Sequence, residues 1–112
     1  MDVELNDSAC AAAIYDALPI EARANTWGEE VYFDVRLSLE LAEGARAEMA
    51  VGEAGYWPTG DAMCLFYGRT PASGPDGKPR AASEVNPLGR VVGDPSILGQ
   101  ISDGDALSLT KG

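Results

Sequence analysis

The sequence predicts a mainly β protein that folds as a small closed barrel with one or two short helices. Short strand-like segments follow one another over most of the chain, and 13 glycines supply the turns and bulges between them. Helical periodicity is confined to two short stretches. No internal repeat or linker divides the 112 residues, so a single domain is expected over 1–112.

The amino-acid composition and charge of the chain restrict the kinds of partner that it is expected to bind. Apolar residues make up 46% of the chain, which is typical of a globular protein, and 18 acidic against 8 basic residues give a net charge of −10. A negative field repels phosphate backbones and acidic lipid surfaces, so neither nucleic acid nor a membrane is an expected partner. The longest apolar stretch, Ala9 to Tyr15, is too short to cross a bilayer. A secretory signal peptide begins with basic residues, whereas acidic residues stand at this N-terminus, so the expected location is cytoplasmic.

The first elements are a strand and a helix. Val3-Glu4-Leu5 alternates like a strand, and Asn6-Asp7-Ser8 offers capping side chains for the helix that follows. From Ala9 to Leu18 apolar residues recur at four-residue spacing, with alanines between them, which predicts a helix that lies close against a sheet. Pro19 ends it.

Strands are expected over most of the remaining chain. Alternation or apolar runs predict them at Arg23–Trp27, Glu30–Val35, 37–41, 47–51, 62–67, 85–92 and 106–109. The run at 62–67 is apolar throughout, which suits a strand that is buried on both faces. Thr70–Pro79 has the composition of a surface loop, and Asp94-Pro95-Ser96 looks like the start of a short helix that reaches Ile101.

Two aromatic segments, Asn25–Phe33 and Gly55–Pro58, are the most informative part of the chain. Trp27 and Trp57 stand beside glycine, proline or carboxylates and not inside an apolar run. Aromatic faces with a few polar groups are typical of a shaped ligand pocket. The alternative is that both rings cap the barrel ends.

Polar residues near these segments are candidates to orient a ligand. In a strand the side chain of Glu30 shares a face with Tyr32, whereas Glu29 points to the opposite face. An arginine at the rim of a pocket holds carboxylates or carbonyls. Each candidate also has an ordinary explanation, as a surface ion pair or a turn hydrogen bond. The candidate ligand-binding residues are Asn25, Trp27, Glu30, Tyr56, Trp57, Arg69, Thr70, Ser73 and Asn86.

The chain contains no histidine, which excludes a histidine-based nucleophile system and the usual zinc ligands. No P-loop or dinucleotide fingerprint is present. The two cysteines, Cys10 and Cys64, are expected to be buried thiols, and Asp103-Gly104-Asp105 is expected to be a turn and not a cation site. No cofactor or metal is therefore expected, and no catalytic residue is assigned.

Several motifs together carry a resemblance to a family. They are Asn25–Phe33, Gly52–Gly60, Met63–Ser73, Ala81–Val91 and Asp103–Asp105. Read in this order, they make the chain resemble small prokaryotic cyclophilin-like proteins. The resemblance implies a closed, mostly antiparallel eight-stranded barrel with a short helix closing one end. Members share the barrel of peptidyl-prolyl isomerases but lack their catalytic set, and their biochemical role is unsettled.

The resemblance also implies a departure at the start of the chain. Relatives carry a further strand ahead of the segment that matches 3–7, which here follows only Met1 and Asp2. We therefore expect the first family strand to be missing or truncated. An unpaired edge of this kind predicts a homodimer formed through the N-terminal edge strand, or lower stability than a longer chain has.

Three functions remain open. The leading hypothesis is a binding module that holds a peptide or small ligand between Tyr56, Trp57 and Trp27, oriented by Arg69 and Asn86. The alternative is an enzyme of the peptidyl-prolyl cis-trans isomerase type, which needs no histidine, nucleophile or metal and would use Arg69 as its donor. The third is a structural or assembly partner that acts through an open barrel edge.

Overall fold

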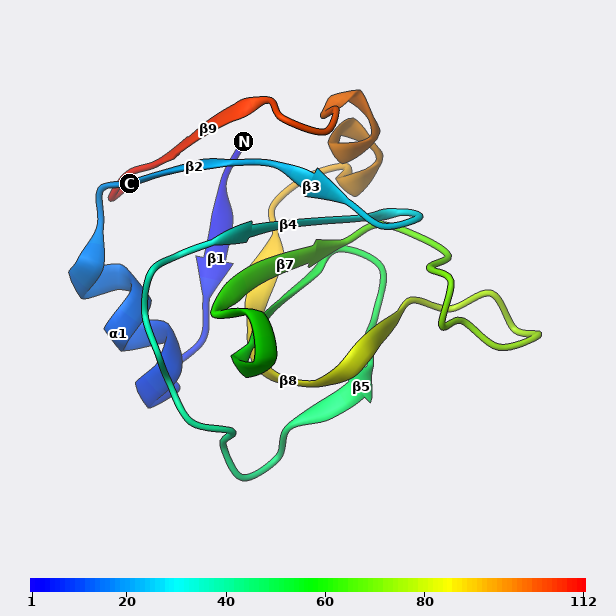
Figure 1. The fold of residues 1–112 in the computed structure, drawn as a ribbon, viewed down its shortest axis with the longest axis horizontal. Coiled ribbons are helices and arrows are strands. Elements are labelled where there is room, and N and C mark those ends of the chain that lie inside the picture. Colours follow the sequence, from blue (N-terminus) through cyan, green and yellow to red (C-terminus); the bar gives the residue numbers. More distant parts are fainter.

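A computed structural model, which describes residues 1–112, contains nine strands, one α-helix and two 3₁₀ helices (Figure 1). In chain order these are β1 (Val3–Leu5), α1 (Ala9–Ala17), β2 (Ile20–Arg23), β3 (Asn25–Thr26), β4 (Glu30–Asp34), β5 (Arg46–Glu48), β6 (Glu53–Trp57), η1 (Pro58–Gly60), β7 (Ala62–Phe66), β8 (Arg80–Val91), η2 (Pro95–Gln100) and β9 (Ala106–Leu109). The prediction of a mainly β protein with short helices is confirmed.

The strands form two antiparallel sheets. The larger has seven strands in the order β1-β8-β6-β7-β4-β3, with β5 also paired to β8, and the smaller consists of β2 and β9. Only Ala24 separates β2 from β3, and its N–H donates to the carbonyl of Asp105 at 2.8 Å, so the smaller sheet extends the edge of the larger one.

The predicted closure of the barrel is not confirmed. β1 pairs only with β8, and β9 pairs only with β2. The sheets therefore curve around a common interior but stay open between β1 and β9, which lie near each other in Figure 1.

Helix α1 begins and ends close to where the sequence predicts. The side chain of Ser8 caps its first turn by accepting from the N–H of Ala11 at 3.1 Å. The last helical residue is Ala17, and Pro19 follows the C-cap Leu18. Ala11 and Ile14 face the interior and are buried, which packs the helix against the sheet.

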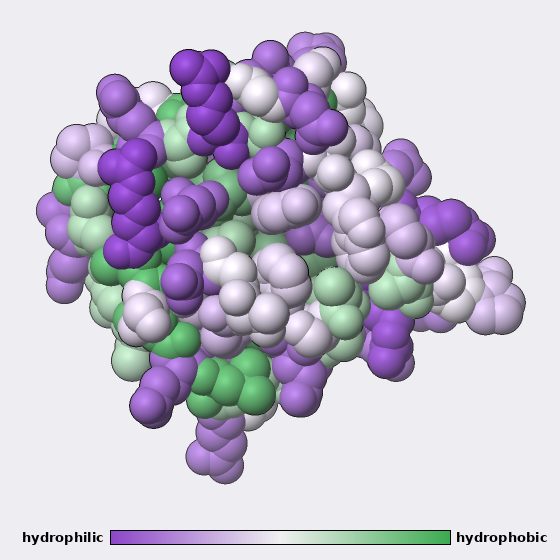
Figure 2. All heavy atoms as spheres, in the orientation of Figure 1, coloured by the Kyte–Doolittle hydropathy of each residue, from purple (hydrophilic) through white to green (hydrophobic).

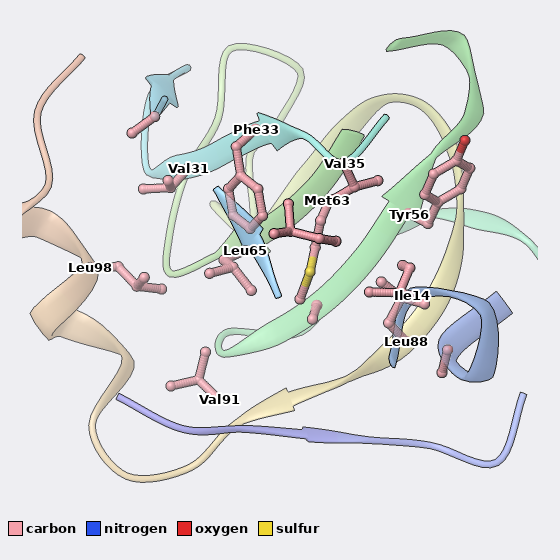
Figure 3. Close-up of a cluster of buried hydrophobic side chains, with 14 residues drawn as sticks. Ile14, Val31, Phe33, Val35, Tyr56, Met63, Leu65, Leu88, Val91 and Leu98 are labelled. Atoms are coloured by element: carbon pink, nitrogen blue, oxygen red, sulfur yellow. The ribbon is translucent and has the colours of Figure 1, made fainter. Parts of the chain in front are cut away.

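The main core lies inside the curved sheets (Figure 3). Alternate residues of the central strands point inward: Val31 and Phe33 from β4, Met63 and Leu65 from β7, and Tyr56 from β6. This is the period-two pattern of a strand with one face on the core.

A second, smaller cluster covers the opposite face of the same strands. It contains Cys64 and Phe66 from β7, Ala81 and Val85 from the first half of β8, and Met49 after β5. All five residues of β7 are buried, so the prediction of a strand buried on both faces is confirmed.

The prediction of a strand at 37–41 is wrong, because the backbone groups of this segment form hydrogen bonds with side chains instead of with a neighbouring strand. The hydroxyl of Tyr56 donates to the carbonyl of Leu37 at 2.6 Å and accepts from the N–H of Leu39 at 3.0 Å. The side-chain amide of Asn86 bonds the carbonyl of Glu40 and the N–H of Ala42 at 3.0 and 2.7 Å. The alternating leucines therefore lie on an irregular segment.

The sequence predicts no strand at the position of β6, and β8 begins earlier than its predicted strand. β6 includes Gly55, a residue that weakens a strand pattern, but an added Cβ there would stand 2.8 Å from Cγ2 of Val85. The glycine thus permits β6 and β8 to pack closely. β8 begins at Arg80, five residues before the predicted start, and its bulge lies near Pro87.

The surface is predominantly hydrophilic on the face drawn in Figure 2, with small separate hydrophobic areas between charged side chains. None of the helices has the length and apolar character needed to cross a membrane.

Candidate functional site

A pocket of about 170 Å³ lies on the outer face of the sheet, between strands β4, β6 and β7 and the first half of β8. Its lining is mostly aromatic and apolar, with one carboxylate. The lining residues are Trp27, Glu30, Tyr32, Trp57, Cys64, Ala81 and Ala82.

Strand register explains why these residues meet. Cys64 of β7 lies opposite Tyr32 of β4 on one side and Gly55 of β6 on the other. Glu30 stands two residues before Tyr32, and Trp57 stands two residues after Gly55, so both share the face of Cys64. The strand residues beside them, Val31, Tyr56, Met63 and Leu65 among them, point into the main core instead.

The indole of Trp57 is fixed by three neighbours. Its Nε1 donates to Oγ of Ser83 at 2.6 Å. The ring of Tyr32 meets it edge to face, with centroids 6.2 Å apart and an interplanar angle of 80°. An added Cβ on Gly60 would stand 2.7 Å from two of its ring carbons, so the indole lies against this glycine. Trp57 therefore forms a preorganised wall.

Trp27 stands on the turn between β3 and β4, and this turn is docked onto another loop. The N–H of Trp27 donates to the carbonyl of Glu30 at 3.0 Å, and the N–H of Glu29 donates to the carbonyl of Arg69 at 2.8 Å. Gly28 has a φ of +60°, and an added Cβ would stand 2.9 Å from that Arg69 oxygen. The turn therefore needs a glycine here, both for the left-handed backbone and for the close approach.

Glu30 is the one charged residue in the lining, and only 5% of the residue is exposed. The two ion pairs of the chain, Arg46–Glu53 and Arg80–Glu48, do not involve it. Burial raises the pKa of Glu30 from 4.5 to about 7, and a hydrogen bond from the Cys64 thiol acts in the opposite direction. The carboxyl group thus titrates near neutral pH inside an aromatic pocket.

Cys64 is held as a neutral thiol. Burial, together with the neighbouring Glu30 carboxylate, raises the pKa of Cys64 well above its ordinary value. A thiol in this state is a weak nucleophile and a hydrogen-bond donor. Cys64 therefore acts as a floor for the pocket and a partner for Glu30, and it forms no disulfide with Cys10.

The structure brings together three of the nine predicted site residues: Trp27, Glu30 and Trp57. Tyr56 points into the main core and Asn86 is buried, and the polar atoms of both hold the segment 37–42. Asn25 is exposed, and its side-chain amide donates to the carbonyl of Tyr32 at 3.4 Å.

The other three candidates organise the loop after β7. Arg69 is exposed, and its Nη1 donates to the carbonyl of Gly74 at 3.2 Å. The N–H of Thr70 donates to Oγ of Ser73 at 2.9 Å, and this hydroxyl donates to the carbonyl of Lys78 at 2.6 Å. Arg69, Thr70 and Ser73 therefore lie outside the pocket, and the donor that the isomerase alternative requires is not beside the aromatic rings.

Sequence reasoning did not include Tyr32, Cys64, Ala81 and Ala82 among the site residues. For Tyr32 a signal exists, because it stands two residues after Glu30 on the same strand face. For Cys64 the signal is the pairing of β4 with β7, which a single sequence does not show. The two alanines give no signal, because nothing in the sequence distinguishes an alanine that lines a pocket from any other alanine.

The comparisons with known proteins agree with this architecture. The model of a family described as cyclophilin-like matches residues 1–110. The chain belongs to the cyclophilin-like family. The resemblance inferred from the sequence motifs is therefore confirmed.

A solved relative supports the same fold. This cyclophilin-like chain is similar to a hypothetical protein from Archaeoglobus fulgidus, whose structure was determined in solution, with 37% sequence identity and a TM-score of 0.80. The match covers 98% of this chain and 85% of the archaeal one. No curated protein matches the chain. The family and this relative thus establish the fold.

Proposed function

We propose that this cyclophilin-like protein is a binding module that holds a small chemical group between Trp27, Tyr32 and Trp57. The observation that carries the proposal is the pocket itself, in which three aromatic rings stand around a nearly buried carboxylate. A mostly apolar cavity with one well-placed polar group is the usual form of a small-ligand site. The fixed positions of Trp57 and of the Trp27 turn support it, since preorganised walls lower the entropic cost of binding.

The size of the pocket restricts the ligand. Sites for drug-sized molecules have about 300–1,000 Å³, whereas this pocket has about 170 Å³. One water occupies about 30 Å³ of liquid. The pocket therefore admits a single head group or one side chain, and a longer peptide would place only one residue inside it.

Tryptophan fluorescence gives a direct test, because the chain has two tryptophans and both line the pocket. We expect saturable changes in emission when the protein is titrated with neutral, anionic and cationic fragments of the size of one amino-acid side chain. Tyr32→Ala should abolish saturation, whereas Tyr15→Ala, which removes an exposed ring on α1, should preserve it. If no fragment of any charge class gives a saturable change, the proposal is wrong.

We also propose that the open edge at β1 pairs with a second copy of the chain. The carbonyl of Asp2 accepts from the N–H of Val92, directly after β8, and the N–H of Asn6 donates to the carbonyl of Leu88 in β8. In an antiparallel ladder the alternate residues Val3 and Leu5 then direct their N–H and C=O groups away from β8. Between this edge and β9 lies a groove of about 600 Å³ in which eight of twelve lining residues are hydrophobic. An edge strand beside an apolar groove supports strand addition.

A proline substitution tests this second proposal. Val3→Pro removes an outward N–H and should shift the protein toward monomer in sedimentation velocity experiments. Val3→Ala shortens the side chain but keeps the N–H, and it should leave the dimer in place. A wild-type protein that sediments as a monomer at high micromolar concentration would contradict the proposal.

A further inference from the structure

From the same pocket we infer the class of ligand: an alkylated ammonium cation, whose charge lies between the rings of Trp27, Tyr32 and Trp57 and against the carboxylate of Glu30. The inference rests on the proposed binding function and adds the chemistry of the group that is bound.

The first reason is the aromatic lining. The faces of tryptophan and tyrosine carry negative charge density, and a cation near such a face is attracted to it. Here two tryptophans and one tyrosine line a space of about 170 Å³, so a compact cation in the pocket stands near all three rings. Part of the Trp57 ring lies against Gly60, and the same residue also lines the pocket, where a ligand would meet it.

The second reason is the charge balance inside the pocket. Glu30 is 5% exposed and forms no ion pair, and no lysine or arginine contributes to the lining. A buried carboxylate without a counter-ion is unfavourable, and a bound cation would supply that counter-ion. An anionic ligand would face the carboxylate directly. The net charge of −10 also raises the local concentration of cations around the protein.

The third reason concerns the number of N–H groups on the ligand. A primary ammonium brings three donors that each need an acceptor after burial. Six of the seven lining residues are hydrophobic, and the carboxylate of Glu30 is the main acceptor among them. An ammonium whose hydrogens are largely replaced by methyl groups avoids this shortage, because its methyl groups contact the rings. The lining therefore favours methylated over primary ammonium groups.

A matched pair of probes tests the inference. Choline carries a trimethylammonium group, and 3,3-dimethyl-1-butanol has the same shape with a carbon in place of the nitrogen and no charge. Titrations followed by tryptophan fluorescence and by calorimetry should show choline binding at least about tenfold more tightly than the neutral isostere. Ethanolamine, which carries a primary ammonium, should bind more weakly than choline.

Two adjacent glutamates supply a matched pair of variants. Glu30→Gln keeps the size of the side chain but removes the charge from the pocket, and it should weaken choline binding by about tenfold while leaving the neutral isostere unaffected. Glu29→Gln makes the same change one residue earlier, where the side chain accepts from the N–H of Arg69 at 3.2 Å and lies outside the pocket. It should leave choline binding at the wild-type level.

The outcomes separate the inference from the proposed function. If choline and its neutral isostere bind equally, or if Glu30→Gln binds choline as well as Glu29→Gln does, the pocket binds apolar groups and the cation inference is wrong. If neither probe binds while other fragments do, the inference fails and the binding function stands. If no fragment binds at all, both fail. A circular dichroism spectrum and a cooperative urea transition for each variant establish that it is folded before its binding is compared.

Discussion

Replacing Glu30 with glutamine should make the protein more stable at alkaline pH, and the size of the effect can be worked out from the pocket. Glu30 is nearly buried and lies among aromatic rings, with only the Cys64 thiol as a hydrogen-bond partner. Burial raises its pKa from 4.5 to about 7. One pKa unit corresponds to about 1.36 kcal/mol, so the ionised carboxylate lowers the stability of the folded state by about 3 kcal/mol.

The direction follows from proton binding. Because the pKa of Glu30 is higher in the folded protein than in the unfolded chain, the folded state binds this proton more tightly. The free energy of unfolding therefore falls as the pH rises from about 4.5 to about 7, and the full loss remains above that range. Glutamine has no proton to lose, so the variant avoids the loss.

Urea denaturation at pH 4.5 and pH 8.5 measures the effect. The difference in the free energy of unfolding between Glu30→Gln and the wild type should be about 3 kcal/mol larger at pH 8.5 than at pH 4.5. Glu29→Gln controls for the loss of one negative charge at the surface next to the pocket. If the two variants show the same dependence on pH, the carboxylate of Glu30 is not held in an apolar environment, and the reasoning from burial fails.

Two further predictions test the fold around the site. Tyr56→Phe removes the hydroxyl that bonds Leu37 and Leu39, so the free energy of unfolding should fall by about 1–3 kcal/mol in urea, with Tyr15→Phe as a neutral control. Gly89→Ala should disrupt the pairing of β1 with β8, because an added Cβ would stand 1.9 Å from the carbonyl oxygen of Glu4; hydrogen exchange at Glu4 should rise strongly. Gly89 and Gly44 both have a positive φ, but an added Cβ on Gly44 would have nothing within 4 Å, so Gly44→Ala should produce only the backbone cost of about 1–2 kcal/mol. Equal losses from the two alanines would contradict the steric argument.

Local patterns account for most of the elements. The caps and the alanine-rich periodicity predict α1, and the apolar run predicts β7, because these signals act over a few residues. The strand expected at 37–41 does not form, since the side chains of Tyr56 and Asn86, which are distant in sequence, form hydrogen bonds with its backbone groups. Hydrogen bonds from side chains so distant in sequence do not change the hydrophobic periodicity of the segment, so the sequence pattern does not show them.

In the site, too, some contacts can be predicted from neighbouring residues, whereas others depend on strands that are distant in the sequence. Alternation along β4 places Glu30 and Tyr32 on one face, and this much can be predicted from the sequence. The role of Cys64 depends on the register of β4 with β7, and the wall at Ala81 depends on the path of β8. The sequence alone does not distinguish the amide of Asn86, which bonds the backbone of Glu40 and Ala42, from an amide that binds a ligand.

The unfavourable placement of Glu30 is the strongest argument that the pocket has a function. For folding alone, a glutamine or an apolar residue at this position would be better, because the carboxylate reduces stability by about 3 kcal/mol above neutral pH. Typical domains are stable by about 5–15 kcal/mol, so the loss is a large fraction of the whole. Positions where local stability is given up without a compensating contact within the chain are expected at functional sites. At Glu30 the missing contact is a positive charge, and the surrounding rings of Trp27, Tyr32 and Trp57 are suited to receive one from outside the chain.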